Sequence, residues 1–320
     1  MITTCNPQLR SKLRELWKLC FQDSSKFLNM FFEDRFNDNN ALLLVDDRDH
    51  SRIISSLYIE PYMFSFYHGN LPLAYISYVC TLPEERNRGY MGQLLRSAIR
   101  TIYERRYAMA ALYPNPNYSE LQKYYCKFGF EQVFKIPARK IVPLKQLYEK
   151  SKCNIDRAFE EYDRRYNRRD FTIIVPKACF RTVMKDAISD NFAVRGRLGG
   201  MMRIIRLQVL MDVFLRYLKT VDNDTKELTV QQLKEPTKLE AKRQDTMFNC
   251  KDDILSANSG CFDVSNYICK DTFYRADLPD SVSINELCRF LFGATVHNLP
   301  EWFHKNQCST NAPMMQLMLE

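Results

Sequence analysis

The sequence predicts a mixed α/β protein, with one mixed β-sheet in its first part and a second α+β region in its last part. Three observations support this prediction. The chain has 320 residues, of which 46% are hydrophobic, and this is enough for two domains with apolar cores. Over residues 1–137, helical spacing of apolar residues and short β-rich runs follow one another in the order ααβββαβα. A highly charged stretch at 144–170 then separates the two parts.

The first part begins with two amphipathic helices between residues 7 and 36, because Leu9, Leu13 and Leu16 recur at helical spacing and a second apolar set follows. Three β-rich runs come next, separated by segments with turn chemistry, and they predict an antiparallel meander. The elements expected here are strands at 41–45, 53–64 and 73–81, a helix within 86–107, a strand at 108–113 and a helix at 119–129.

The second part is predicted to begin with a charged, helical connector. After Phe134 the chain becomes more polar, and a domain boundary is placed there. Asn258, Ser259 and Gly260 supply the turn of a hairpin. The elements expected here are a strand at 171–175, a helix at 177–188, a helix and a strand within 204–217, the hairpin at 248–275 and a helix at 284–292.

Charge and composition limit the classes of partner and compartment. The net charge of +8 favours anionic partners, including nucleotides, nucleic acid and anionic lipid. The longest apolar stretches are about half the ~20 residues that a membrane helix needs, and the N-terminus lacks a signal sequence, so a cytoplasmic protein is expected. The 11 cysteines contain no C-x-x-C pair and the four histidines do not cluster with carboxylates. We therefore expect reduced cysteines and no metal.

The segment 78–95 contains an apolar strand, a basic turn with glycine and an amphipathic helix. Backbone N–H groups at a helix N-terminus have no partner within the helix, and the helix dipole adds positive charge there. Gly89 and Gly92 would let a phosphate approach the backbone, and Arg86 and Arg88 add full charges. The segment therefore predicts an anion site. The alternative is a helix N-terminus whose arginines are merely solvated.

The same segment resembles motif A of the GNAT superfamily of N-acetyltransferases, Q/R-x-x-G-x-G/A. Residues 86–91 (Arg-Asn-Arg-Gly-Tyr-Met) are in register with it, except that Met91 stands where the motif has Gly or Ala, with Gly92 directly after. Residues 125–130 resemble the Y-x-x-x-G-F of the same superfamily, and the order ααβββαβα is the GNAT order. The resemblance implies a GNAT fold with a splayed central sheet for residues 1–137.

The resemblance also implies acetyl-CoA as co-substrate. Backbone groups of Val79, Cys80 and Thr81 would bind its pantetheine arm, and one of these N–H groups would stabilise the oxyanion formed in acyl transfer. Asn117 and Ser119 are candidates for a polar contact with the pantetheine. The residues implied for the pyrophosphate are Arg86, Asn87, Arg88, Gly89, Tyr90, Met91 and Gly92.

Tyr125 is the predicted general acid. Its phenol is protonated at neutral pH and could donate that proton to the departing CoA thiolate. The alternative is a half-buried aromatic residue like Tyr124 beside it. Cys80 and Cys126 lie near the motifs, but no paired base is visible, so we interpret them as packing residues.

Residues 72–89 are in register with P-x-A-x-I-x-x-V-x-T-x-P-E-x-R-x-x-G, and the segments 199–205, 256–263 and 287–293 are similar to parts of a sterol-carrier-protein-like domain. With these motifs the chain resembles the enhanced-intracellular-survival (Eis) type of acetyltransferase. That resemblance implies a GNAT domain at 1–137, a helical connector or reduced second GNAT-like region at 138–195, and a sterol-carrier-protein-like domain at 196–320. It also implies that the C-terminal carboxylate, here that of Glu320, enters the active site of the first domain as the base. The alternative is a frayed terminus. If Glu320 is not the base, Glu60 is the next carboxylate to test.

The predicted function is transfer of an acetyl group from acetyl-CoA to a primary amine by direct attack in a ternary complex. One alternative is a non-catalytic CoA-binding or regulatory protein with the same fold. A second is a basic nucleic-acid or anionic-lipid binder, although the arginine-rich segment 156–170 carries as many acidic residues as arginines, so no nucleic acid or membrane partner is expected. The sequence does not identify the acceptor amine, and a homo-oligomer is left open.

Overall fold

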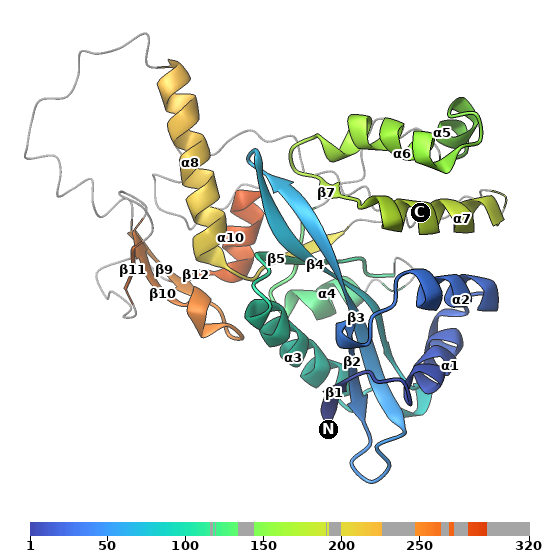
Figure 1. Ribbon diagram of the computed structural model, residues 1–320. Helices are drawn as coiled ribbons and strands as arrows, with labels where there is room; N and C mark the ends of the chain where they lie inside the picture. The colour runs from blue at the N-terminus through green and yellow to red at the C-terminus, as the bar shows by residue number, and fades with distance from the viewer. Residues whose placement is uncertain are drawn as a thin grey trace, which may run out of the picture.

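A long antiparallel hairpin is the centre of the first sheet. It is formed by β3 (Ile53–Phe66) and β4 (Gly69–Thr81), which pair from Phe66–Gly69 at the turn to Ser55–Thr81 at the far end (Figure 1). The computed structural model describes residues 1–115, 118, 120–133, 144–189, 191, 200–225, 247–263, 269–271 and 281–292.

The first sheet is mixed. Its strand order is β1-β2-β3-β4-β5-β8-β6, and β7 pairs with β3 beside this path. The pairs β1–β2, β2–β3, β3–β4, β5–β8 and β6–β8 are antiparallel, whereas β4–β5 is parallel. The remaining strands are β1 (Ile2–Thr4), β2 (Ala41–Val45), β5 (Met109–Leu112), β6 (Glu131–Gln132), β7 (Ile173–Ile174) and β8 (Met201–Ile204).

Helices cover both faces of this sheet, and the alternation of side chains along β2 shows how. Leu42 and Leu44 belong to the core on the α3 side, and Leu43 and Val45 belong to the core on the α1–α2 side. Because strand side chains point alternately to opposite faces, a strand between two helical layers must be apolar throughout. The helices are α1 (Arg10–Phe21), α2 (Ser25–Asp34), α3 (Tyr90–Glu104) and α4 (Glu120–Cys126).

The connector is a small helical unit with its own apolar cluster. Its helices are α5 (Leu144–Lys150), α6 (Ile155–Tyr162) and α7 (Lys177–Ser189), and a π-helical turn at Asp163–Asn167 extends α6. Leu147, Tyr162 and Phe180 bring the three helices together. The strand β7 that follows α6 pairs with Met63 and Phe64 of β3, so the connector is joined to the first sheet.

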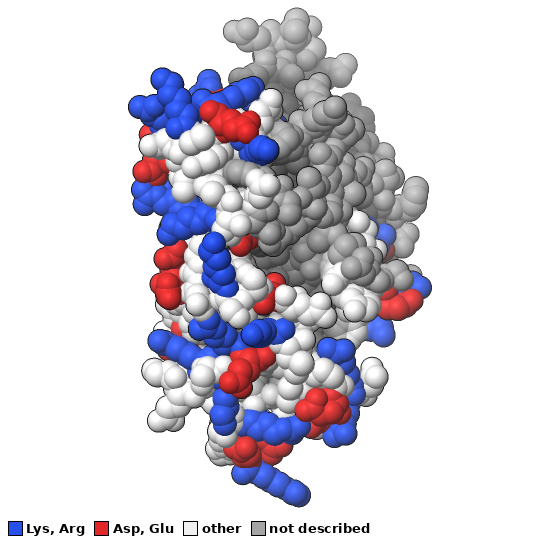
Figure 2. All heavy atoms as spheres, turned by 90° about the vertical axis from the view of Figure 1, so that its right-hand side faces the viewer, with Lys and Arg blue, Asp and Glu red and all other residues white. Residues whose placement is uncertain are grey.

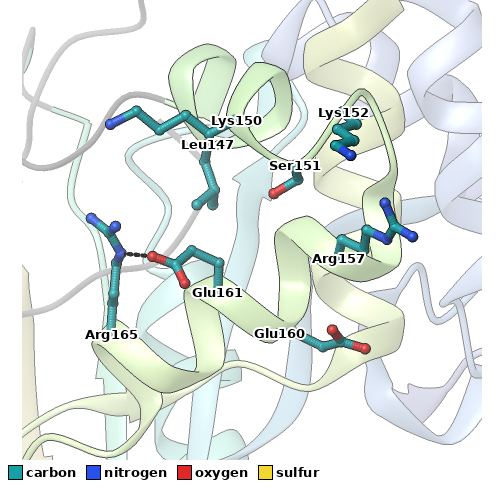
Figure 3. A pocket seen from close by; sticks show the side chains of 8 residues that line it. All are labelled: Leu147, Lys150, Ser151, Lys152, Arg157, Glu160, Glu161 and Arg165. Carbon is teal, nitrogen blue, oxygen red and sulfur yellow. Dashed lines mark hydrogen bonds and ion pairs between the residues drawn. The ribbon is translucent and has the colours of Figure 1, made fainter.

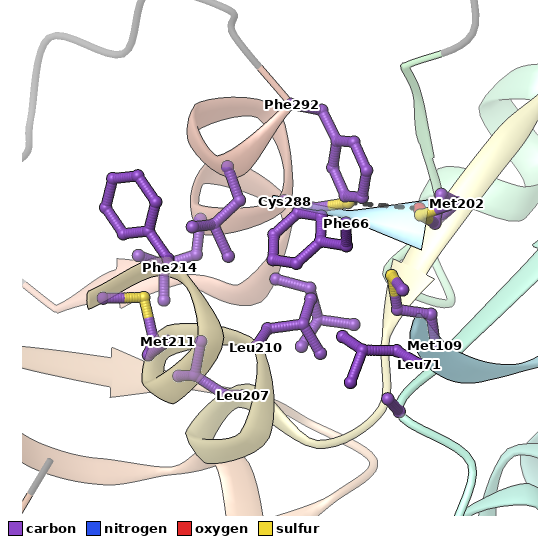
Figure 4. Packing of buried hydrophobic residues seen from close by; sticks show 14 of the residues in the cluster. Phe66, Leu71, Met109, Met202, Leu207, Leu210, Met211, Phe214, Cys288 and Phe292 are labelled. Atoms are coloured by element: carbon purple, nitrogen blue, oxygen red, sulfur yellow. Dashed lines mark hydrogen bonds between the residues drawn. The ribbon is translucent and has the colours of Figure 1, made fainter. Parts of the chain in front are cut away.

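A second sheet of four strands, in the order β11-β10-β9-β12, lies in the last part of the chain. Its elements and the helices beside it are α8 (Leu207–Thr225), β9 (Met247–Lys251), β10 (Gly260–Asp263), β11 (Cys269–Asp271), β12 (Val282–Ser283) and α10 (Ile284–Leu291). Leu210 and Phe214 of α8, Cys288 of α10 and Phe66 of β3 meet in one apolar cluster (Figure 4). The last part of the chain therefore shares a core with the first sheet.

The predicted order of elements over residues 1–137 is confirmed, with two short strands, β1 and β6, added at its ends. β1 was not predicted, because three residues carry little local signal and this strand depends on pairing with β2. The stretch 204–217, predicted as a helix and a strand, is occupied by α8 from Leu207 onward, and the strand lies before it as β8, in the first sheet between β5 and β6. The division at 137 and 195 stays a prediction, and β8 shows that the sheet of the first part takes a strand from beyond residue 195.

Gly129 and Arg203 form a close junction between these two parts. Gly129 has φ +81°, and a Cβ atom there would lie 1.6 Å from Nη1 of Arg203. The Arg203 guanidinium passes under Gly129 to donate to the carbonyl oxygen of Phe128, and it also forms an ion pair with Asp252. Glycine is therefore needed here for both its backbone conformation and its size.

Within the described residues, no helix combines the length and the apolar composition needed to cross a membrane.

Candidate functional site

β4 and β5 separate at one end, and this leaves part of β4 without a strand neighbour on that side. Their pairing runs from Leu73–Met109 to Ile76–Leu112, where β5 ends. β4 continues to Thr81, so the predicted pantetheine residues Val79, Cys80 and Thr81 all lie beyond the last pair in the part of the chain that the structure describes. Backbone groups on such an edge need partners, and an extended ligand arm can supply them.

A β-bulge lies where this edge begins. The register between β3 and β4 shifts between Ser56–Cys80 and Tyr58–Ser77, and Tyr78 has φ +50°. Because of the extra residue, side chains beyond the bulge point to the opposite face from the one that regular alternation gives. Ile76 belongs to the core on the α3 side, and so does Val79, three positions later. The bulge therefore turns Val79 toward α3 and Cys80 toward α1.

The bulge is held by α1 and by Asp23, which follows this helix. The ring of Tyr78 stacks on Trp17 with centroids 3.9 Å apart, and its hydroxyl donates to Asp23 at 3.2 Å. Trp17 in turn donates from Nε1 to Oγ of Ser56, at 3.0 Å. A positive φ at a non-glycine residue costs free energy, so it persists only where the surroundings fix it, and such strain is concentrated at functional sites.

The basic turn leads into an uncapped helix. Asn87 has φ +64° and Gly89, the N-cap of α3, has φ +79°. The Gly89 carbonyl accepts from Gln93, but no side chain caps the helix and no acidic residue lies in its first turn. The N–H groups of Tyr90, Met91 and Gly92 therefore point out of the helix end, where an anion is favoured.

The two glycines of this segment have different surroundings. A Cβ atom at Gly89 would meet nothing within 4 Å, so a ligand could approach the backbone there. A Cβ atom at Gly92 would lie 3.5 Å from Cζ of Phe128 and 3.7 Å from the hydroxyl of Tyr124. The side-chain position of Gly92 thus faces α4 and its following turn, whereas that of Gly89 faces open space.

The two arginines also differ. Arg86 is exposed and donates from Nε to the carbonyl oxygen of Thr81 at 3.3 Å, so it joins the end of β4 to the turn. Arg88 forms an ion pair of 3.0 Å with Glu85, which also accepts from Arg52 at 2.7 Å. Part of the Arg88 charge is therefore compensated within the turn, and Arg86 is the freer cation for a ligand.

Tyr125 lies in α4, and its side chain is buried in the same core as α3 and Phe130. Burial is the main cause that raises the pKa of its phenol above the ordinary value, and the charges of Tyr124 and Cys80 add to it. The phenol is therefore a proton donor and not a base. Among the described residues we find no hydrogen-bond partner for its hydroxyl. The three other predicted site residues, Asn117, Ser119 and Glu320, lie outside the described residues.

Glu60 on β3 is buried in a network that the sequence did not reveal. It forms an ion pair with Arg35, which follows α2, and accepts hydrogen bonds from Ser77 at 3.3 Å and from Tyr62 at 3.4 Å. Burial raises the pKa of the Glu60 carboxyl, and the Arg35 charge acts in the opposite direction. In the sequence, Glu60 is the single charged residue of the β-rich run 53–66, and that feature alone could have suggested a buried partner.

A separate hollow of about 450 Å³ lies between α5 and α6 (Figure 3). Its lining includes Lys150, Arg157 and Glu160, and it includes none of the predicted site residues. Arg165 at its edge is paired with Glu161. Figure 2 shows that basic and acidic side chains alternate over the described residues on one face of the molecule, without a field of one sign.

Among the described residues, no group of three or more His, Cys, Asp or Glu side chains has the arrangement of metal ligands.

The comparisons with known proteins agree with this geometry. Residues 4–133 match the family model described as an acetyltransferase (GNAT) domain. No curated protein matches the sequence. Residues 4–133 include β2 to β6 and α1 to α4, and so contain the splayed edge, the basic turn and Tyr125.

Solved structures share the fold over almost the whole chain. A probable N-acyltransferase from Enterococcus faecalis V583 and a GCN5-related N-acetyltransferase from Anabaena variabilis each have a TM-score of 0.58 and 14% identity, with 98% of both chains covered. Eis1 from Mycobacterium abscessus has a TM-score of 0.56 and 11% identity, again with 98% of both chains covered. Residues 4–133 are thus an acetyltransferase domain of the GNAT class, and the chain that contains this domain is an acyltransferase.

Proposed function

We propose that the protein transfers an acetyl group from acetyl-CoA to a primary amine, by direct attack of the amine in a ternary complex. The observation that carries the proposal is the edge of β4 beyond Ile76, which leads directly to the uncapped N-terminus of α3. An extended ligand with an anionic end matches this arrangement, because the edge offers backbone groups and the helix end offers N–H donors.

CoA has these two features in one molecule. Its pyrophosphate would be held by the N–H groups of residues 87–92 and by Arg86, and its pantetheine arm would run along Val79–Thr81. Asn117 and Ser119 remain candidates for a polar contact with that arm. The thioester would then lie near the bulge at Tyr78, where the strand changes face.

The residues present can support the chemistry of amine acetylation. Attack of a neutral amine on the thioester carbonyl places negative charge on the carbonyl oxygen, and a backbone N–H on the open edge can stabilise it. The attacking nitrogen becomes positively charged and loses a proton to the proposed base or to water, after which the C–S bond breaks and the electron pair stays on the sulfur of CoA. Tyr125 would then donate its proton to that thiolate.

The first test concerns the pyrophosphate. Gly89→Asp and Gly89→Asn introduce side chains of the same shape, and both residue types tolerate a positive φ, so the two variants differ only in charge. We expect CoA affinity in the aspartate variant to be at least tenfold weaker than in the asparagine variant, because about 1.4 kcal/mol of repulsion suffices for that factor. Isothermal titration calorimetry measures both constants. Equal affinities in two folded variants would contradict the assignment.

The second test concerns the acceptor. Thiol release from acetyl-CoA with a panel of polyamines, aminoglycosides, amino acids and lysine peptides measures turnover. An amine that supports turnover identifies the acceptor class. If CoA stabilises the protein against heat while no amine supports turnover, the alternative of a non-catalytic CoA-binding protein is favoured.

The third test concerns the base, which we propose is the carboxylate of Glu320. An alkylammonium ion has a pKa of about 10.4 and must lose a proton before it attacks. Deletion of Leu319 and Glu320 is expected to lower kcat at least tenfold and to leave CoA affinity unchanged. A tag after Glu320 converts its α-carboxylate to an amide, and Glu320→Gln removes only the side-chain carboxylate, so the pair shows which group acts. If the truncated enzyme turns over at the full rate, Glu320 is not the base, and Glu60 is the next carboxylate to test.

A further inference from the structure

Two cysteine thiols from distant parts of the sequence are neighbours beside the open edge of β4. Cys20 is in the last turn of α1 and is half-buried, and its Sγ lies 3.7 Å from the carbonyl oxygen of Thr81. Cys80, the residue before Thr81, is buried, and Cys20 packs against the apolar cluster to which Cys80 belongs. Sγ of Cys80 lies 3.3 Å from Oγ of Ser56.

We propose that Cys20 and Cys80 form a thiol–disulfide exchange site that reacts with low-molecular-weight disulfides, with Cys20 as the attacking thiol and Cys80 as the resolving thiol. The arrangement supplies what such a site needs: one accessible sulfur, and a second sulfur close enough to attack it after it has been modified. The sequence around either cysteine does not predict this site, because 59 residues lie between the two positions.

The exposure of the two thiols assigns the two roles, because Cys20 is half-buried whereas Cys80 is buried, and the electrostatic surroundings agree. The pKa of the Cys20 thiol is lowered to about 7, first by the hydrogen bond with Cys80 and then by Arg86, while burial and the charge of Glu84 act in the opposite direction. The pKa of Cys80 is raised, first by burial and then by Cys20. Cys80 therefore keeps its proton, and Cys20 supplies the thiolate, which is the nucleophile in exchange.

The reaction balances without any other oxidant. The Cys20 thiolate attacks one sulfur of the external disulfide, the S–S bond breaks, and one external thiolate leaves and takes a proton from water. Cys80 then attacks Sγ of Cys20 and gives up its proton to the second departing thiolate. The products are one disulfide within the protein and two external thiols, so the protein loses two hydrogens and the external disulfide gains them.

The site would regulate acetyl transfer, and this consequence rests on the proposed function. A covalent bond from α1 to Cys80 would fix the strand next to Thr81, where the pantetheine arm is proposed to bind. It would also remove the thiolate that faces Arg86. We therefore expect oxidation to reduce acetyl transfer, and reduction with dithiothreitol to restore it.

The test treats the full-length protein with oxidised glutathione and follows its intact mass and its non-reduced peptides. We expect a loss of two hydrogens and a peptide that links residues 20 and 80. Cys80→Ser is expected to stop at one glutathione on Cys20, and Cys20→Ser is expected to take up none at Cys80. Cys80→Ala gives the same readout if the serine variant does not fold. Cys153→Ser is the matched control, because Cys153 is exposed and lies in the connector.

Three results would overturn the proposal. One is a folded wild-type protein that forms no link between residues 20 and 80. Another is a Cys80→Ser protein in which glutathione is on Cys153 but not on Cys20. The third is a rate of alkylation at Cys20 whose midpoint in pH lies at the ordinary thiol value of about 8.5 instead of about 7. Because mass and alkylation do not require turnover, these results are independent of whether the proposed acetyl transfer is correct.

Discussion

Tyr125→Phe is expected to lower kcat for acetyl transfer by about 100-fold or more, with little change in CoA affinity. The substitution removes only the hydroxyl, and loss of a general acid typically costs factors of 10² to 10⁴. Burial already raises the pKa of this phenol above its ordinary value, so the wild-type group stays protonated well above neutral pH. The loss is therefore expected at every pH where the enzyme is folded, without a titration of Tyr125 in the neutral range.

The fold should not contribute to this loss. The ring of Tyr125 packs in the core beside Phe130, and phenylalanine keeps that contact. The matched control is Tyr124→Phe, which removes a hydroxyl from the adjacent position on α4. We expect its kcat to stay within a fewfold of the wild-type value. Stopped-flow or steady-state thiol release measures both variants, and equal rates for Tyr125→Phe and the wild type would leave Tyr125 as a packing residue.

Asp252→Asn is expected to lower the free energy of unfolding by about 3–5 kcal/mol, because it leaves a buried guanidinium without its counter-ion. Nη2 of Arg203 lies 2.7 and 2.8 Å from the two carboxylate oxygens of Asp252, and both side chains are 1% exposed. Asp252 also accepts from Nδ2 of Asn258 at 2.9 Å. Nε of Arg203 already lacks a hydrogen-bond partner among the described residues, so the substitution would add to an existing deficit of partners for this guanidinium.

Asp253→Asn provides the control for this prediction. Asp253 is the next residue in the chain, but its carboxylate is exposed and pairs with Lys251 at 3.5 Å. An exposed pair contributes at most about 1 kcal/mol, so this variant should be close to the wild type. Urea unfolding monitored by circular dichroism measures both free energies. A similar small loss in the two variants would show that the Arg203–Asp252 pair does not hold the two sheets together.

The sequence by itself determined the elements whose signal is local. The helical spacing of apolar residues from Leu94 to Ile102 gave α3, and its buried residues are those that the spacing placed on one face. Gly89 and the basic turn before α3 predicted the anion site, because a helix N-terminus needs no distant partner to expose its N–H groups. The order of elements over residues 1–137 followed from the same local periodicities.

The tertiary structure alone decided the features that depend on distant residues. The faces of Val79 and Cys80 follow from the bulge at Tyr78, which Trp17 and Asp23 hold from another element. β8 joins the first sheet by pairing with β5 and β6, which lie about 70 to 95 residues earlier in the chain, so its place depends on distant residues.

The buried pairs have the same origin. In the sequence, Arg203 and Asp252 are two ordinary charged residues, and Cys20 and Cys80 are two ordinary thiols. Their properties change only where the fold excludes water and brings each residue next to its partner. Hydrophobic spacing is a property of a segment and can be read from that segment. The protonation and reactivity of a buried group are properties of its neighbours, and these come together only when the chain has folded.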